Sequence, residues 1–246
     1  MANLTGKIAI VTGASSGIGR GIAERLGRDG ASVLVNYHSD EDGGRATAEA
    51  IMSSGSKAET APGDMRNKAD VERVFQACLG AFGRPDILVN NAGVGVLQPL
   101  AETDDQAFER IFGLNCRGTL FCLGQAATHL NDEGRIVNIG SSSATYPWPG
   151  AAMYASSKAA VLKMTEIAAV ELAARRINVN SVIPGITDTP MSKALPAEAK
   201  QPVIEASPWK RLGTPDDIAA VVAFLVGPDA LWVTGQHILA NGGSGH

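Results

Sequence analysis

The sequence predicts a single α/β domain in which a doubly wound parallel sheet of about seven strands carries helices on both faces. Short β-branched runs alternate with longer amphipathic stretches, which is the order of repeated βαβ units. The run Ile8-Ala9-Ile10-Val11 is continuously apolar, as strands buried on both faces are. The 246 residues fit one large domain, 1–246, with no linker or internal repeat.

The individual elements follow in chain order, and right-handed crossovers place helices on both sides of the sheet. Strands are expected at Ile8–Val11, Ser32–Tyr37, Lys57–Ala61, Ile87–Asn90, Arg135–Ile139, Asn178–Ile183 and His237–Ala240. Helices are expected at 18–29, 41–54, 67–82, 104–130, 152–174 and 215–226. The stretch 184–214 contains five prolines and reads as irregular, and we expect a functional lid at about 186–214.

Composition and charge exclude several classes of protein. The net charge is −4 and no Lys/Arg block stands out, so nothing indicates a nucleic-acid partner. The three cysteines and four histidines lack the spacing of metal ligands, and we expect no metal. The start has no apolar signal segment, and no uncharged apolar run approaches the 18 or so residues of a membrane span. We therefore expect a cytoplasmic protein without a membrane partner.

A glycine-rich turn follows the first strand and opens the first helix. Strand, turn and helix N-terminus together form a phosphate site, because small residues let the backbone approach and the helix end offers free N–H groups. Tight left-handed turns are the alternative reason for such glycines. The position after the first strand favours dinucleotide binding. The candidate contacts are Gly13, Ser15, Ser16, Gly17, Ile18 and Gly19.

The end of the second strand bears on the choice of cofactor. Folds that bind NAD usually place an acidic residue there for the ribose hydroxyls, but this chain has Asn36. Nothing at Asn36 repels a 2′-phosphate, and His38 and Ser39 are candidate donors to it. We therefore expect NADP(H), with NAD(H) possible, although no Arg or Lys follows to clamp the phosphate. Two acidic residues, Asp40 and Glu41, follow closely, and they can be explained as the N-cap and first-turn acid of the next helix.

Two further strand ends contribute candidate cofactor contacts. Asp64, with Met65, follows the third strand, where it either accepts a hydrogen bond from adenine or caps the helix near residue 67. Asn90-Asn91-Ala92-Gly93 closes the fourth strand, and its small residues would let the backbone pack against the cofactor. A simple Asn-Gly-type turn is the alternative there. Asn91, Ala92 and Gly93 are therefore counted as candidate contacts.

Tyr154 and Lys158 are four residues apart at the head of a long helical pattern, and therefore share one helix face. A Tyr with its ordinary pKa of about 10 exchanges its proton poorly near neutral pH. A nearby cation lowers that pKa, which makes Tyr154 a candidate general acid/base. The same spacing also occurs by chance in many helices, so the prediction depends on the other motifs.

The order and spacing of these motifs resemble the short-chain dehydrogenase/reductase family from Lys7 to Gly243. The resemblance implies a Rossmann-type fold, a nicotinamide cofactor and hydride transfer between a ketone or other carbonyl and a secondary alcohol. The matching segments are Thr12-Gly13-x-x-x-Gly17-x-Gly19, Asn90-Asn91-Ala92-Gly93, Ser141, Tyr154-x-x-x-Lys158 and Pro184-Gly185.

The resemblance also implies roles for single residues. Tyr154 would be the acid/base, and Lys158 would lower its pKa and bind the nicotinamide ribose. Ser141 would hydrogen-bond the substrate oxygen, since it lies 13 residues before Tyr154 as in this family; Ser143 is the stronger alternative among its neighbours. Asn115 would hold a water that links Lys158 to solvent, or else is a polar residue at a helix kink.

The segment after the sixth strand would contact the nicotinamide through Pro184, Gly185, Thr187 and Thr189, with Thr189 gripping the carboxamide. Thr187 departs from the family, which usually has an aliphatic residue there. Asn241 likewise replaces an acidic residue near the C-terminus and could change a subunit contact.

The substrate end is less specific. Tyr146-Pro147-Trp148-Pro149 is expected to form one pocket wall, with Trp209 closing the lid from the other side. The chain resembles 3-oxoacyl-carrier-protein reductases and, through its Pro-Trp-Pro run, bacterial glucose dehydrogenases; a broad ketone reductase fits equally well. A catalytically silent NADP(H)-binding sensor is the alternative of another class.

The resemblance further implies a homotetramer built through the helices at 104–130 and 152–174. Ala159, Ala160, Met164, Ala168 and Ala169 would either pack between subunits or face this chain's own sheet.

Overall fold

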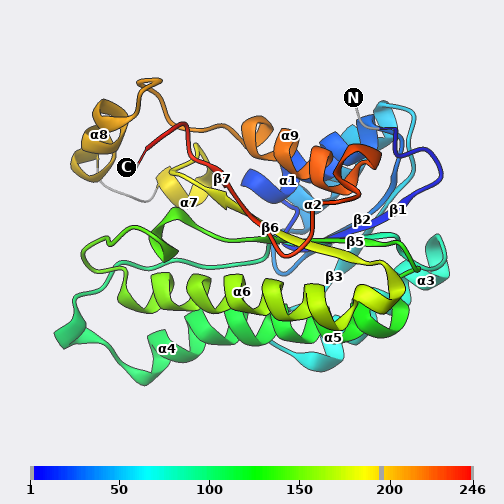
Figure 1. The fold of residues 1–246 in the computed structure, drawn as a ribbon, viewed down its shortest axis with the longest axis horizontal. Helices are drawn as coiled ribbons and strands as arrows, with labels where there is room; N and C mark the ends of the chain where they lie inside the picture. The colour runs from blue at the N-terminus through cyan, green and yellow to red at the C-terminus, as the bar shows by residue number, and fades with distance from the viewer. Residues whose placement is uncertain (1–2, 194–196, 245–246) are drawn as a thin grey trace.

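Seven parallel strands form one sheet in the order β3-β2-β1-β4-β5-β6-β7 in the computed structural model, which describes residues 3–193 and 197–244 (Figure 1). This arrangement confirms the predicted fold class. The strands are β1 Ile8–Val11, β2 Ser32–Tyr37, β3 Ala58–Pro62, β4 Ile87–Asn90, β5 Arg135–Ile139, β6 Asn178–Pro184 and β7 His237–Ala240. Five match their predicted bounds; β3 lies one residue later than expected and β6 ends one residue later.

Helices cover both faces of the sheet (Figure 1). One apolar core lies under α1, α2 and α9, and a second lies under α3, α5 and α6. The helices are α1 Gly17–Arg28, α2 Glu41–Ser53, α3 Lys68–Ala81, α4 Asp105–Phe112, α5 Thr119–His129, α6 Ala152–Glu171, α7 Pro190–Lys193, α8 Ala197–Ala206 and α9 Pro215–Val226. The helix predicted at 104–130 is divided by a π-helical turn, Gly113–Gly118, between α4 and α5.

The strand order reverses at β1, which pairs with β2 on one side and with β4 on the other. Ligands of open parallel sheets bind at such a switch point, outside the carboxyl ends of the strands. In this chain those ends lead into the glycine-rich turn, into residues 91–99 after β4, and into residues 140–151 after β5. The topology therefore gathers at one edge the segments that carry the predicted site.

The segment 184–214 is more regular than expected, because it contains α7 and α8. Pro190 begins α7, where a missing N–H has no cost. Pro202 lies inside α8, where proline is unfavourable, and it was one of the five prolines from which an irregular segment was predicted. The predicted lid includes residues 194–196, which lie outside the described residues.

No helix within the described ranges is both long enough and apolar enough to span a bilayer.

Candidate functional site

The glycine-rich turn packs directly against the segment that follows β4. Gly13 has a φ of 61°, and a Cβ atom added to it would lie 2.9 Å from the Cα atom of Ala92. An added Cβ at Gly19 would lie 2.3 Å from the side-chain nitrogen of Asn91. Both positions therefore require glycine. Ser16 is the N-cap of α1 and makes no side-chain capping bond, so its hydroxyl and the helix N–H groups can serve a phosphate.

Thr12 and Asn91 hold this turn against β4. The Thr12 hydroxyl accepts hydrogen bonds from the backbone N–H groups of Asn91 at 3.0 Å and Ala92 at 3.1 Å. The Asn91 amide in turn donates to the carbonyls of Thr12 and Gly13, each at 2.9 Å. Asn91 thus shapes the cradle with its side chain, a role that the sequence pattern did not reveal. Thr12 belonged to the motif but had no assigned role.

Asn36 is buried at the end of β2 and its side chain is used internally. Its Oδ1 accepts a hydrogen bond from the backbone N–H of Gly13 at 3.1 Å. Its Nδ2 donates to the carbonyls of Ala61 at 3.1 Å and Gly63 at 3.2 Å. Asn36 therefore ties the turn to the ends of β2 and β3. It places no negative charge there, as expected, but its own polar atoms point into the protein.

The segments after β2 and β3 meet beside the turn. His38 and Ser39 are exposed, and the His38 ring nitrogen lies 3.8 Å from a carboxylate oxygen of Asp64. Arg66 donates to both oxygens of Asp64 at 3.0 and 2.9 Å, and this bond lowers the carboxyl pKa. Arg66 is thus a basic residue beside the predicted adenosine site that the search for a cation directly after β2 missed.

Helix capping accounts for some of the acidic residues near the predicted adenosine site. Asp40 accepts a hydrogen bond from the backbone N–H of Gly43 at 3.0 Å, so its predicted role as the N-cap of α2 is confirmed. Asn67, and not Asp64, caps α3 by accepting from the N–H of Ala69 at 3.0 Å. The capping alternative for Asp64 is therefore wrong, and its contact with adenine stays a prediction.

Ser141 and Tyr154 meet at the carboxyl end of β5. Ser141 caps a short 3₁₀ turn, Ser142–Ala144, and its hydroxyl lies 2.9 Å from that of Ser143. A side-chain hydrogen bond joins Ser141 to the Tyr154 phenol. Burial raises the phenol pKa and this hydrogen bond lowers it in part. The net direction is upward, contrary to the lowering by Lys158 that the i, i+4 spacing suggested.

Lys158 is buried below the same site. Its Nζ donates to the backbone carbonyl of Ile139 at 2.8 Å, and burial lowers its pKa to about 8. A Cβ added to Gly93 would lie 3.2 Å from this Nζ and 3.2 Å from Oδ1 of Asn115. The structure therefore brings Gly93, Asn115 and Lys158 together, and the small residue at 93 gives the other two their room.

Asn115 lies within the π-helical turn and is fully buried. Its side chain exchanges two hydrogen bonds with the backbone of Val94, both at 2.9 Å. The same amide donates to the Ser157 hydroxyl at 2.9 Å. The helix is indeed irregular here, as the structural alternative supposed, and the side chain holds the segment after β4 in place. The predicted water contact is not tested by these bonds.

The segment after β6 completes the other side of the site. An added Cβ at Gly17 would lie 3.3 Å from the side chain of Thr189, so this threonine faces the glycine-rich turn. Thr187 is buried and donates its hydroxyl to the carbonyl of Gly185 at 3.0 Å. Pro184 ends β6 in register with Ala240. Of the four predicted contacts in this segment, Thr189 is the one whose side chain lies against the turn.

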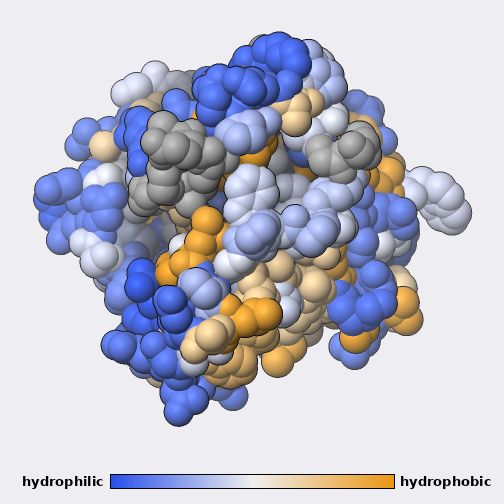
Figure 2. Space-filling view, turned by 90° about the vertical axis from the view of Figure 1, so that its left-hand side faces the viewer, coloured by the Kyte–Doolittle hydropathy of each residue, from blue (hydrophilic) through white to orange (hydrophobic). Residues whose placement is uncertain are grey.

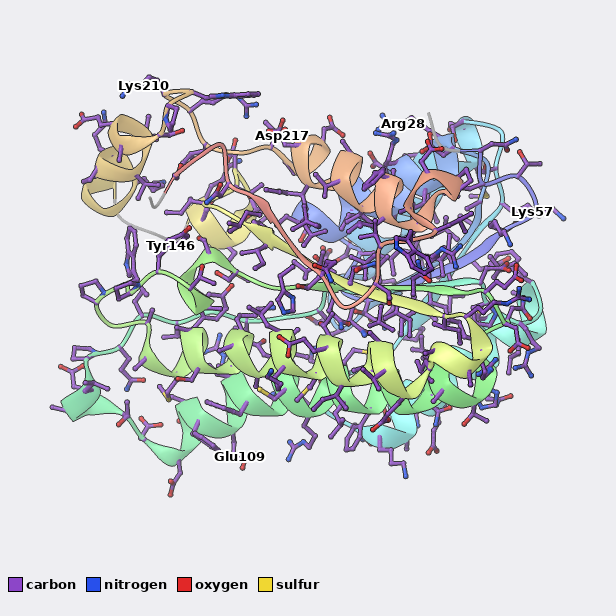
Figure 3. All side chains as sticks on the ribbon, in the orientation of Figure 1. Arg28, Lys57, Glu109, Tyr146, Lys210 and Asp217 are labelled. Atoms are coloured by element: carbon purple, nitrogen blue, oxygen red, sulfur yellow. The ribbon has the colours of Figure 1, made fainter. Side chains whose placement is uncertain are left out.

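Apolar side chains gather at the end of the molecule that carries α7 and α8, next to the candidate site. Tyr146 lies at the end where α7 and α8 are found (Figure 3). The surface at that end carries apolar residues bordered by hydrophilic ones (Figure 2). Exposed apolar side chains from segments beside the site include Leu97, Leu100, Met191 and Trp209. An added Cβ at Gly95 would lie 3.2 Å from the Tyr154 ring, so the backbone at residue 95 packs closely against this side chain.

Together these residues form a cradle of glycines and free helix N–H groups that ends at two hydroxyls above a buried ammonium group. The cradle suits a pyrophosphate, and the hydroxyls suit a carbonyl oxygen. The residues present therefore fit a dinucleotide.

Comparison with known proteins gives matches along nearly the whole chain. A family model described as enoyl-(acyl carrier protein) reductase matches residues 13–245. An uncharacterized oxidoreductase of Methylorubrum extorquens is 41% identical over 246 residues, which cover 99% of each chain. A hydroxynaphthalene reductase-like protein of Metarhizium brunneum is 41% identical over 256 residues, covering 98% of this chain and 96% of that protein.

A solved structure shows the same agreement in three dimensions. The angucycline C-6 ketoreductase LanV with bound NADP matches with a TM-score of 0.94 at 37% identity. The match covers 98% of this chain and 96% of that chain. The whole domain, and not only its nucleotide-binding half, is therefore shared with these proteins.

Proposed function

The chain belongs to the short-chain dehydrogenase/reductase family of NAD(P)-dependent oxidoreductases, and we propose that it interconverts a ketone and a secondary alcohol with NADP(H). The observation that carries the proposal is the meeting of Ser141 and Tyr154 above buried Lys158 at the carboxyl end of β5. The two hydroxyls are within hydrogen-bond distance of each other, so both could donate to one carbonyl oxygen that gains negative charge.

The preference for NADP(H) is supported by the end of β2. Asn36 leaves that end without a carboxylate, and His38 and Ser39 are exposed beside it. LanV, a relative over the whole chain, was solved with bound NADP. The residues that would hold the cofactor are those of the glycine-rich turn, Ala92, Gly93, Lys158 and Thr189. When bound, the nicotinamide supplies the hydride.

The protein's part in the reaction is orientation and proton transfer. Ser141 and Tyr154 donate hydrogen bonds to the substrate carbonyl oxygen, and the phenol passes its proton to that oxygen as it becomes an alkoxide. Burial favours the neutral phenol, which is the form that reduction consumes. Lys158, four residues further along the same helix, would stabilise the phenolate that remains, because the burial that lowers its pKa also leaves its charge poorly screened.

We propose an apolar ring ketone as the substrate class. Leu97, Met191 and Trp209 are exposed apolar residues on segments beside the site, and Gly95 lets the backbone pack closely against the Tyr154 ring, where a larger residue would crowd it. Flat aromatic and aliphatic walls suit a ring system better than a hydroxyl-rich sugar. The Metarhizium relative is named for hydroxynaphthalenes, which agrees with this reading.

We further propose that the protein is a homo-oligomer, with a tetramer as the expected form. Leu120 of α5 and both Ile167 and Val170 of α6 are large apolar residues that are at least half exposed, and such a patch marks an interface. Ala168 and Ala169, which were expected to pack either between subunits or against this chain's own sheet, lie in this chain's own core. Light scattering on the purified protein measures the oligomeric state directly.

The test is the oxidation of NADPH or NADH, followed by absorbance, with a fused-ring ketone such as 2-tetralone. A 3-oxoacyl thioester and an enoyl thioester serve as competing substrates, and glucose with NADP⁺ is assayed in the reverse direction. We expect turnover with NADPH and the ring ketone. Tyr154→Phe should lose about 10²- to 10⁴-fold in kcat, the usual contribution of a general acid, and still bind NADPH.

Two outcomes contradict the proposal. Near-normal activity of Tyr154→Phe would remove Tyr154 from the chemistry. Binding of NADPH without turnover of any substrate would favour the silent sensor, whereas preferred turnover of the enoyl thioester would change the reaction from carbonyl to alkene reduction.

A further inference from the structure

Ser157 is buried beside the proposed active site, one residue before Lys158 and three after Tyr154. Its hydroxyl donates to the backbone carbonyl of Tyr154 at 2.7 Å. The same oxygen accepts a hydrogen bond from the Asn115 amide at 2.9 Å. The Ser157 hydroxyl therefore donates one hydrogen bond and accepts another, and so links the first turn of α6 to the π-helical turn.

The π-helical turn makes a second bond to the same residue. The thiol of Cys116 lies 3.4 Å from the backbone carbonyl of Ser157. Asn115 is itself fixed, because its side chain exchanges two hydrogen bonds with the backbone of Val94 and its carbonyl accepts from the Thr119 hydroxyl at 2.7 Å. Ser157 is thus where the segment after β4, the π-helical turn and α6 are joined.

From these contacts we infer that Ser157 is a positioning residue, whose hydroxyl fixes the Tyr154 phenol relative to Ser141 and Lys158. The inference rests on the proposed function of Tyr154 in proton transfer. Ser157 does not touch the reacting atoms. It acts through the backbone of Tyr154 on one side and through Asn115 on the other.

The physical reason lies in the uncapped first turn of α6. Its N-cap, Ala151, has no side-chain capping bond, so the turn lacks the usual polar anchor at its start. Loss of the Ser157 hydroxyl would leave the buried Asn115 amide with one donor unpaired, which favours a shift of both elements. A shift of about 1 Å at reacting groups costs up to about 100-fold in rate.

The experiment compares Ser157→Ala, Ser157→Thr and Tyr154→Phe with the wild type, with Ser156→Ala as the matched control because Ser156 is exposed on the same turn. We expect Ser157→Ala to lower kcat by about ten- to 100-fold with KM for NADPH nearly unchanged. The pH profile of alcohol oxidation should move to higher pH, because the hydrogen bond from Ser141 that favours the phenolate is weakened.

Ser157→Thr keeps a hydroxyl that can bond the carbonyl three residues earlier in a helix, and it should recover most of the lost kcat. A purely structural role would lower the melting temperature of Ser157→Ala and leave its pH profile and kcat below that temperature unchanged, which would overturn the inference. Equal loss in Ser157→Thr and Ser157→Ala would also overturn it. If Tyr154→Phe is active, the proposed function fails instead, so the two failures are distinguishable.

Discussion

The side-chain oxygen of Asn36 lies 3.1 Å from the backbone nitrogen of Gly13 and accepts its hydrogen bond. Asn36 lies near the end of β2 and Gly13 follows β1, its parallel neighbour, so a side chain of one strand shapes the turn that follows the other. Asn36 holds the turn with a neutral side chain, and its amide also donates to the carbonyls of Ala61 and Gly63. The same residue thus supports the turn and places no carboxylate of its own near the end of β2.

Asn36→Ala is expected to weaken the binding of NADPH and to lower the free energy of unfolding by about 1–3 kcal/mol. The cost arises because the carbonyls of Ala61 and Gly63 lose a buried donor. Isothermal titration with NADPH measures binding, and urea unfolding measures stability. Ser39→Ala is the control for the unfolding measurement, since Ser39 is exposed. A variant with normal NADPH affinity would show that Asn36 does not shape the turn.

Gly19→Ala is expected to abolish measurable NADPH binding, because the added Cβ would lie 2.3 Å from both the Asn91 amide and the Gly13 carbonyl. The matched control is Gly80→Ala in α3, where an added Cβ meets nothing within 4 Å. That control should gain up to about 1 kcal/mol of stability from helix propensity and bind NADPH normally. Normal binding by Gly19→Ala would contradict the close packing described for the cradle.

Lys158→Met is expected to stabilise the fold at pH 7 while removing activity. Burial lowers the Lys158 pKa from 10.5 to about 8, a cost of about 3 kcal/mol at 1.36 kcal/mol per unit. Loss of the hydrogen bond to Ile139 offsets about 1 kcal/mol of the gain. We therefore expect about 2 kcal/mol of added stability in urea unfolding.

The pH dependence of that difference has a definite sign. Below pH 8 the lysine is protonated in the folded and unfolded states, and the full cost applies. Between about 8 and 10.5 only the unfolded state holds the proton, so this component of wild-type stability rises with pH. The advantage of Lys158→Met should therefore shrink as the pH rises. Cys78 and Cys122, whose pKa values burial raises to about 12, contribute equally to both proteins. A variant less stable than wild type at pH 7 would contradict the prediction.

The fold could be predicted largely from local patterns. Short β-branched runs located β1, β2, β4, β5 and β7 at their observed bounds. In β1 and β4 the run is almost entirely apolar, because strands buried on both faces permit few polar residues. The same reasoning missed α7 and α8, since prolines at 190 and 202 signal a break in the absence of tertiary context. A helix kink at Asn115 was one alternative from the sequence, but its π-helical form was not predicted, because no residue type marks such a turn.

The sequence by itself determined where most strands lie, the glycine-rich turn after β1 and the family resemblance, because these depend on residue types at short spacings. Tertiary structure alone decided which polar side chains face the site and which are used to build it. Asn36, Asn91 and Asn115 were all predicted to serve a ligand or water, yet each spends its amide on backbone groups from distant segments. The physical reason is that a buried amide must be satisfied by whatever groups the fold brings within about 3 Å, and those partners lie 20 to 80 residues away in the chain.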